Sequence, residues 1–160
     1  MSKTLFMETT EIPPEKTVAE IQTVLVAYGA SALLTEFEAG AVTAVSFKHR
    51  VNGTDMPFRL PCRWQAIAEI LRKRARVSDY AWKSTYDSDL KRRQMYELKA
   101  RRVAWRQILR WVQAQMALVE TEMVSVEEVF FQYLQVKSGR TFFEHFKEKQ
   151  FQLDYKEPES

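Results

Sequence analysis

Positively charged side chains crowd the middle of this chain, and the chemistry that they suit is the binding of phosphate groups. Residues 61–110 hold 14 Lys and Arg against 5 Asp and Glu, a balance of +9. The flanking residues 1–60 and 111–160 have balances of −2 and −4, so the net charge of the whole chain is only +3. A basic segment between two acidic ones is typical of proteins that bind nucleic acid or an acidic partner.

The cations that could contact phosphates fall on two predicted helices, over 63–76 and over 89–123. Arg92, Lys99 and Arg106 are seven residues apart and Arg110 follows one turn later, so they are predicted to form a stripe on a solvated helix face. Binding through such a stripe depends strongly on salt, because each phosphate contact releases counterions. The predicted nucleic-acid-binding cations are Arg72, Lys73, Arg74, Arg76, Lys91, Arg92, Arg93, Lys99, Arg106 and Arg110.

Aromatic residues are interleaved with these cations, and all four Trp lie between residues 64 and 111. Cations mixed with exposed rings suit single-stranded nucleic acid, whose bases stack on the rings. Trp82, in a predicted linker, is the best candidate for stacking, whereas Trp105 is predicted to lie in the core. The alternative interpretation is a solvated helix face, or a surface for an acidic protein, with the Trp side chains packed inside.

Few residues suit catalysis. Glu36 and Glu38 share one face of a predicted strand and could hold Mg²⁺, although a solvent-facing surface is the favoured interpretation. Cys62 lies just before a predicted helix, where its thiol pKa could be lowered, and His49 is expected to be a partly buried histidine. Because no Gly-rich phosphate loop and no cluster of metal ligands is present, the sequence predicts no cofactor, no metal site and no enzymatic activity.

The elements that position these residues begin with a helix over 15–28, whose residues Val18, Ile21 and Leu25 share one face. Strands over 31–38 and 42–51 follow. Asn52-Gly53 favours a type I′ turn, which pairs the second strand with a third and places Phe47 opposite Phe58. Pro57 cannot donate to a ladder, so the third strand is expected to form an edge.

Helices follow the sheet. The long helix over 89–123 has an apolar seam that is expected to pack on another helix or on a second copy of the chain, giving a possible homo-oligomer. Ser125 and Glu128 form a capping box for a further helix, and 141–151 form a last aromatic segment. The seam contains Leu98, Trp105, Leu109 and Val112.

The predicted fold class is α+β, with a three-stranded antiparallel sheet and two helices in the order α-β-β-β-α, then a long basic helix and a C-terminal helical segment. The predicted domains are a small α+β domain over 1–76, a linker over 77–88, a helical extension over 89–153 that packs on it, and a frayed tail over 154–160. No apolar run reaches the about 18 residues of a membrane span, and no secretion signal is visible, so the expected location is the cytoplasm.

Two resemblances add to this interpretation. The element order of the first half is similar to that of double-stranded-RNA-binding domains, although the basic cluster at the start of their second helix is missing here. The strings EIPPEKTVAEI at 11–21, PFRLP at 57–61 and VAWRQILRWVQAQ at 103–115 resemble a set of small uncharacterised proteins of bacteriophages and prophages. This second resemblance implies a phage-type origin and carries no activity or site with it.

The sequence therefore predicts a non-enzymatic, phage-type nucleic-acid-binding protein, acting in DNA metabolism in the host cytoplasm and favouring single strands. The alternative is a protein-interaction module, such as a regulator or an anti-defence factor, whose basic face meets an acidic protein.

Overall fold

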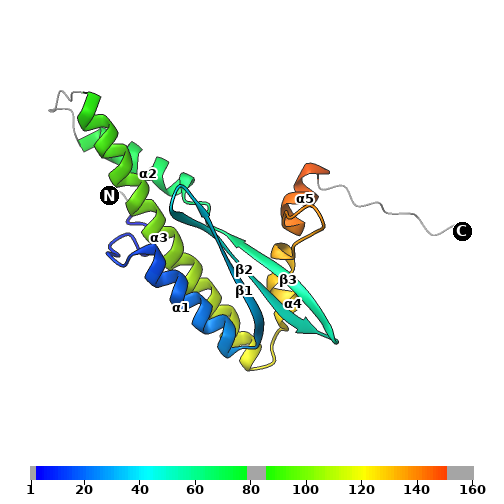
Figure 1. The fold of residues 1–160 in the computed structure, drawn as a ribbon. Helices are drawn as coiled ribbons and strands as arrows, with labels where there is room; N and C mark the ends of the chain where they lie inside the picture. The colour runs from blue at the N-terminus through cyan, green and yellow to red at the C-terminus, as the bar shows by residue number, and fades with distance from the viewer. Residues whose placement is uncertain (1–2, 79–85, 151–160) are drawn as a thin grey trace, which may run out of the picture.

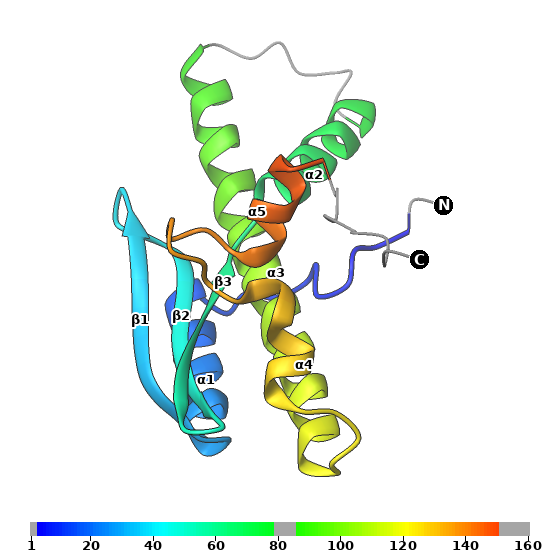
Figure 2. The ribbon, with the colours of Figure 1, turned by 90° about the vertical axis from the view of Figure 1, so that its right-hand side faces the viewer.

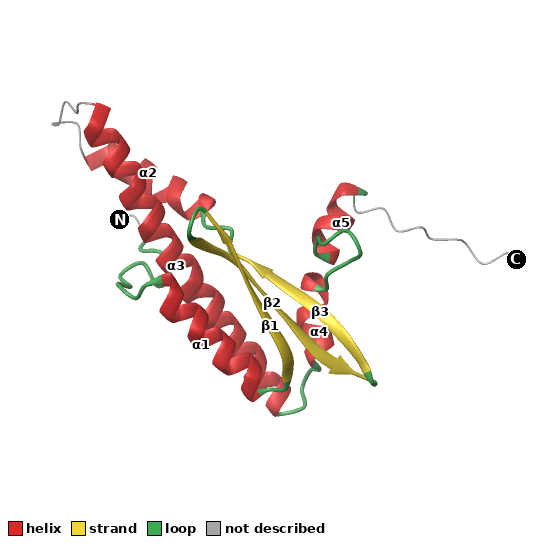
Figure 3. Cartoon of the chain, in the orientation of Figure 1, coloured by secondary structure: helices red, strands yellow, loops and turns green. Residues whose placement is uncertain are grey.

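The computed structural model describes residues 3–78 and 86–150 and confirms the α+β class (Figure 1). In Figure 3 the three strands form one antiparallel sheet, and the other elements are helical. The elements are α1 (Pro14–Ala27), β1 (Ala30–Glu38), β2 (Ala41–Val51), β3 (Thr54–Pro61), α2 (Gln65–Ser78), α3 (Tyr86–Glu120), α4 (Val126–Phe130), the 3-10 helix η1 (Phe131–Tyr133) and α5 (Phe142–Glu148).

The register of the β2–β3 hairpin is the predicted one. Asn52 and Gly53 form the turn with φ of 49° and 79°, the positive values that a type I′ turn requires. Phe47 therefore lies opposite Phe58, and their rings stack with centroids 5.2 Å apart. Pairing continues to Val45 opposite Leu60, so this part of one hairpin face is apolar and buried.

Replacing the turn glycine tests this register. A Cβ at Gly53 would meet no atom within 4 Å, so the cost of Gly53→Val is conformational, that of a β-branched residue held at positive φ. We expect the free energy of unfolding, measured in urea, to fall by about 1–3 kcal/mol. Gly53→Asn is the matched control, because Asn tolerates positive φ and should lose much less. Equal stability of the two variants would contradict the turn geometry.

In the described part of the chain, helices cover one face of the sheet, and no helix packs along the other face. In Figure 2, α3 and α4 lie on the same side of the sheet, and α1 lies behind β2 on the covered face. The α1 side chains Val18, Ile21 and Leu25 are buried as predicted, and Gln22 of α1 donates to the hydroxyl of Thr35 in β1 at 2.8 Å. Sequence spacing thus predicted the correct inner face of α1.

The long helix α3 lies alongside α1, and the chain fills the apolar seam itself. Trp105, Leu109 and Val112 are fully buried, in one cluster with side chains of α1, the sheet and α4. Of the two expected ways of filling the seam, packing within the chain is the one observed at these three side chains, and the possible homo-oligomer stays a prediction. A single core joins α1 and the sheet to α3 and α4.

Leu98 does not belong to the buried seam, contrary to the expectation, and is 46% exposed. The reason is the length of α1. The ion pair of Arg102 with Glu11, just before α1 begins, and the hydrogen bond of Tyr28 with Glu120, just after α1 ends, show that α1 accompanies only the second part of α3. The first turns of α3 extend beyond α1 and the sheet.

The C-terminal segments close the edge of β3. The capping box of Ser125 and Glu128 is confirmed, but α4 and η1 end at Tyr133, earlier than the predicted break at Gly139. The chain leaves the helix there because the Gln135 amide donates to the Pro57 carbonyl at 2.8 Å and Leu134 bridges to Phe58. The edge predicted at Pro57 is thus covered by the chain itself.

Two predicted segments lie partly or wholly outside the described residues. Of the predicted linker over 77–88, the backbone is helical at 77–78 and 86–88, and the rest, with Trp82, is not described. The predicted frayed tail over 154–160 is also outside them. None of the described helices combines the length and the apolar character needed to cross a bilayer.

Candidate nucleic-acid interface

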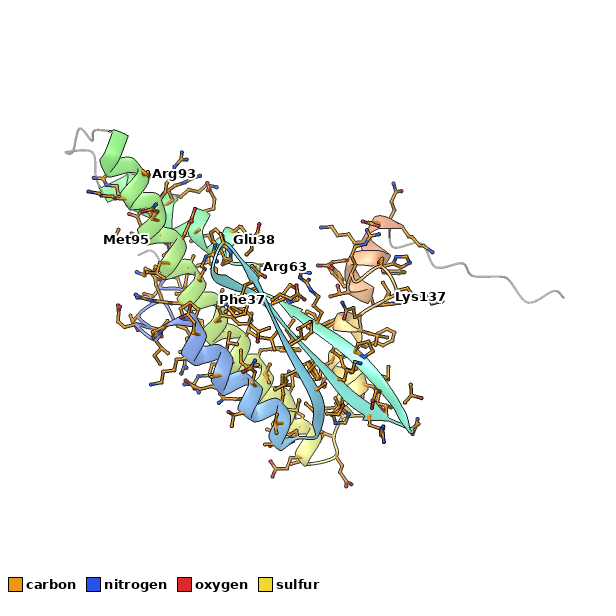
Figure 4. The ribbon with its side chains drawn as sticks, viewed as in Figure 1. Phe37, Glu38, Arg63, Arg93, Met95 and Lys137 are labelled. Carbon is orange, nitrogen blue, oxygen red and sulfur yellow. The ribbon has the colours of Figure 1, made fainter. Side chains whose placement is uncertain are left out.

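Most of the predicted binding cations lie on the last turns of α2 and the first turns of α3, which extend away from the sheet (Figure 2). We call residues 69–75 of α2 and 90–99 of α3 the basic arm. It holds seven basic residues against the two acids Glu69 and Glu97. Figure 4 shows two of its residues, Arg93 and Met95, on the outer part of α3. The basic residues of the arm are Arg72, Lys73, Arg74, Lys91, Arg92, Arg93 and Lys99.

On α2, the arm's cations have acidic neighbours. Glu69 lies one turn before Arg72 and Lys73. Its carboxylate accepts a hydrogen bond from Arg72 and lies 3.9 Å from the ammonium of Lys73. Lys73 nevertheless stays 72% exposed, and an exposed pair of this kind contributes little, so it remains available to a ligand. The α2 backbone includes Arg76, whose side chain lies outside the described residues.

Arg74 is engaged with the N-terminal segment. Its guanidinium donates to Glu8 at 3.0 Å and to the Lys3 carbonyl. The hydrogen bond from the Leu5 backbone amide, together with the charge of Arg74, holds the pKa of the Glu8 carboxyl below its usual range. Lys99, half-buried on α3, also lowers that pKa. Arg74 thus helps to fix the N-terminal segment against the arm.

On α3, three consecutive cations remain available. Lys91 and Arg93 are exposed and Arg92 is half-buried. Within residues 3–78 and 86–150, no ion pair involves any of the three. Together with Lys73 they give the arm its free positive charge.

The expectation that Arg106 lies on a solvated face is wrong. Its residue is only 6% exposed, and its guanidinium donates to Glu20 of α1 at 3.0 Å. The seven-residue spacing places Arg106 on the same face of α3 as Arg92 and Lys99. Only the second half of α3 packs against α1, so this face is solvated at Arg92 and buried against α1 at Arg106. Arg110 is exposed and hydrogen-bonds Gln113, well along α3 from the arm.

Much of the charge asymmetry along the sequence is neutralised by pairing in space. Four cations of the basic third pair with acids from the two acidic thirds. The asymmetry therefore overstates the positive surface, which is concentrated on the arm. The four pairs are Arg63 with Glu144, Arg74 with Glu8, Arg102 with Glu11, and Arg106 with Glu20.

The described tryptophans are packed against protein groups. Trp105 is fully buried, as predicted, and Trp111 makes edge contacts with the rings of Phe130 and Tyr133. The guanidinium of Arg101 lies over the Trp64 ring, 4.4 Å from its centroid. Since Trp82 lies outside the described residues, the predicted stacking on an exposed Trp stays a prediction.

Sequence reasoning missed a cleft between the two helices of the arm. It has a volume of about 210 Å³ and brings Trp64 and Arg72 of the α2 side together with Arg93 and Tyr96 of α3. Ala68 and Arg72 follow Trp64 by four and eight residues, and Tyr96 follows Arg93 by three. The cleft residues of each segment therefore share one helix face. That spacing was visible in the sequence, but the meeting of the two faces depends on how the helices cross.

The residues considered for catalysis are engaged elsewhere. Arg59 donates to both carboxylate oxygens of Glu36, at 2.9 and 2.8 Å, and lowers the pKa of that carboxyl. His49 Nε2 lies 3.1 Å from the Tyr28 carbonyl. Burial raises the pKa of the Cys62 thiol to about 12, the opposite of the lowering expected before a helix. In the described part of the chain, no three His, Cys, Asp or Glu residues are grouped as metal ligands.

No family model, curated protein or solved structure matches this chain. The resemblances to phage proteins and to double-stranded-RNA-binding domains therefore stay predictions.

Proposed function

We propose that this chain is a nucleic-acid-binding protein whose basic arm contacts the phosphate backbone, and that it binds without catalysis. The observation that carries the proposal is the run of Lys91, Arg92 and Arg93 on a helix that extends beyond the core, with Lys73 on the neighbouring helix. A helix that extends beyond the core can bring several cations to successive phosphates.

The resemblance to bacteriophage and prophage proteins supports a role in phage DNA metabolism, in the cytoplasm of the host. The preference for single strands rests on stacking, for which Trp82, outside the described residues, remains the candidate. In the described part of the chain the arm's own ring, Tyr96, is half-buried in the cleft. A duplex contacted mainly through phosphates is therefore included in the test.

A second candidate function is the binding of an acidic protein. It is favoured by the apolar side chains that share the arm with the cations and are 39–57% exposed. Apolar groups mixed with charges are typical of protein interfaces, and Met adapts to varied partners. These side chains are Ile70, Leu90, Met95 and Leu98.

Fluorescence anisotropy with random single-stranded and duplex oligonucleotides tests the first proposal. The variant is the triple substitution Lys91→Ala, Arg92→Ala and Arg93→Ala, for which we expect the affinity to fall about tenfold or more. The slope of log affinity against log salt should fall by about 0.9 per lost contact on duplex and about 0.7 on single strands.

The matched control removes three exposed lysines near α5, Lys137→Ala, Lys147→Ala and Lys149→Ala, which changes the net charge equally. Affinity should change little in this control, since Figure 4 shows Lys137 far from the arm. Equal losses in the two triple variants would mean that net charge alone drives binding. Absence of any binding at low salt, where screening is weakest, would leave the acidic-protein function in its place.

A further inference from the structure

The two edges of the sheet differ sharply. The β3 edge is covered by Leu134 and Gln135, as described above. β1 forms the other edge, and in the part of the chain that the structure describes it pairs only with β2. Figure 2 shows β1 at the margin of the sheet, with its outer side facing away from every other element. A row of backbone N–H and C=O groups is therefore open to another strand.

β1 lacks several of the usual protections of a sheet edge. It is nine residues long and contains no Pro, Lys or Arg; its protections are the acids Glu36 and Glu38 and the two irregularities in its pairing with β2, which lie at the ends of its central run. Leu34 and Phe37 on this strand are 61% and 63% exposed. A long edge strand with exposed apolar side chains is a template for pairing with another strand.

The regular part of β1 is short and has a clear centre. Its pairing with β2 is irregular between Ala30 and Ala32 and again between Glu36 and Phe37. The uninterrupted run is thus Ala32–Glu36, with Leu34 at its middle. Leu34 pairs with Ser46, which pairs with Arg59, so Leu34 stands on the open face of the sheet.

We propose that β1 pairs antiparallel with β1 of a second copy of this chain, about a two-fold axis at Leu34. In this register Leu34 faces Leu34 of the second copy, Leu33 faces Thr35, and Ala32 faces Glu36. The Leu34 pair lies on the axis and occurs once, and each of the other contacts occurs twice, as a two-fold interface requires. Two three-stranded sheets then join into one continuous sheet of six strands.

Charge favours a second copy over a basic peptide. Glu36 is the only charged residue of the regular run, and its carboxylate already receives two hydrogen bonds from Arg59. No carboxylate of the run is left to select a cationic strand. In the self-paired register Glu36 faces Ala32, so no like charges lie opposite each other.

The dimer gives one particle two basic arms. Binding of the first arm to a polynucleotide raises the effective concentration of the second, and the apparent affinity for long strands increases accordingly. The strand pairing itself does not depend on nucleic acid, so it is tested on the protein alone.

The first test is the mass of the full chain in solution, by light scattering and sedimentation over a range of concentrations. We expect a dimer of twice 18.8 kDa. Leu34→Lys puts two cations opposite each other at the two-fold axis and should return the protein to the monomer. Phe131→Lys is the matched control, because Phe131 is 51% exposed on η1, away from β1, and should leave the dimer intact.

The second test is cross-linking, which stays informative even where Leu34→Lys fails to fold. Opposite Cα atoms of an antiparallel pair lie about 4.5–5.5 Å apart, within the range that a disulfide spans. Oxidised Leu34→Cys should therefore form a covalent dimer. Ala32→Cys should not, because the two copies of residue 32 are offset by four residues, about 13 Å along the strands. The native Cys62 is buried and does not compete.

A covalent dimer with Leu34→Cys alone, together with loss of the dimer in Leu34→Lys, supports the proposal. A chain that is monomeric at every concentration overturns it. A dimer that persists in Leu34→Lys and fails to cross-link through Leu34→Cys also overturns it, and assigns the interface to another surface, such as the exposed apolar side chains of the arm.

Discussion

Leu109→Ala is expected to lower the free energy of unfolding by about 2–5 kcal/mol. Leu109 is fully buried near the middle of α3, in the cluster that joins α1, the sheet and α4. Truncation of Leu109 removes buried apolar surface and leaves a cavity lined by side chains of several elements. Because these elements cannot all move inward together, the cavity stays largely unfilled. Urea unfolding of the purified protein, followed by circular dichroism, measures the loss.

Leu98→Ala is the control for this prediction. It makes the same chemical change on the same helix, but Leu98 is 46% exposed and lies beyond the end of α1. Its free energy of unfolding should change by about 0.5 kcal/mol or less. Similar losses in the two variants would show that the seam extends into the arm, contrary to the fold described above.

The fold was largely predictable because its strongest signals are local. Asn52-Gly53 allows one kind of tight turn, and the turn then dictates every partner along β2 and β3. The spacing of Val18, Ile21 and Leu25 likewise fixes one inner face for α1. Such features depend on a few neighbouring residues, so one sequence is enough to find them.

The points that failed depend on contacts between distant segments. Helix periodicity places Leu98 in line with Leu109, but where a buried seam ends depends on the length of α1, which accompanies only part of α3. The C-terminal helix is shorter than predicted because Leu134 pairs with Phe58 of β3, and no local sequence pattern predicts that contact.

The candidate site was predictable only in part, for the same reason. A count of charges finds the basic segment, but it cannot tell that Arg74 and Arg106 are paired with Glu8 and Glu20. The cations left for a ligand lie where α2 and α3 extend beyond α1 and the sheet. They are Lys73, Lys91, Arg92 and Arg93. Position in the fold, rather than charge density along the chain, separates structural arginines from available ones.

Arg106→Ala is expected to lower the free energy of unfolding by about 2–3 kcal/mol, because three buried methylenes contribute about 0.8 kcal/mol each. Loss of the ion pair adds little, since the Glu20 side chain is 39% exposed and can be hydrated when its partner is removed. Arg106→Leu should lose less than Arg106→Ala. It refills the space with apolar atoms and removes Nε, which has no partner among the described residues.

Arg110→Ala separates this structural role from a role in binding. Arg110 lies one turn further along α3 and is exposed, so its removal should leave stability nearly unchanged.

Oligonucleotide affinity and its salt slope, measured well below the unfolding transition, should be the same for Arg106→Leu as for the natural chain. The reason is that a buried guanidinium paired with Glu20 cannot reach a phosphate. A lower salt slope in Arg106→Leu would mean that α1 and α3 separate when nucleic acid binds, and the interface would then extend from the arm along the whole of α3.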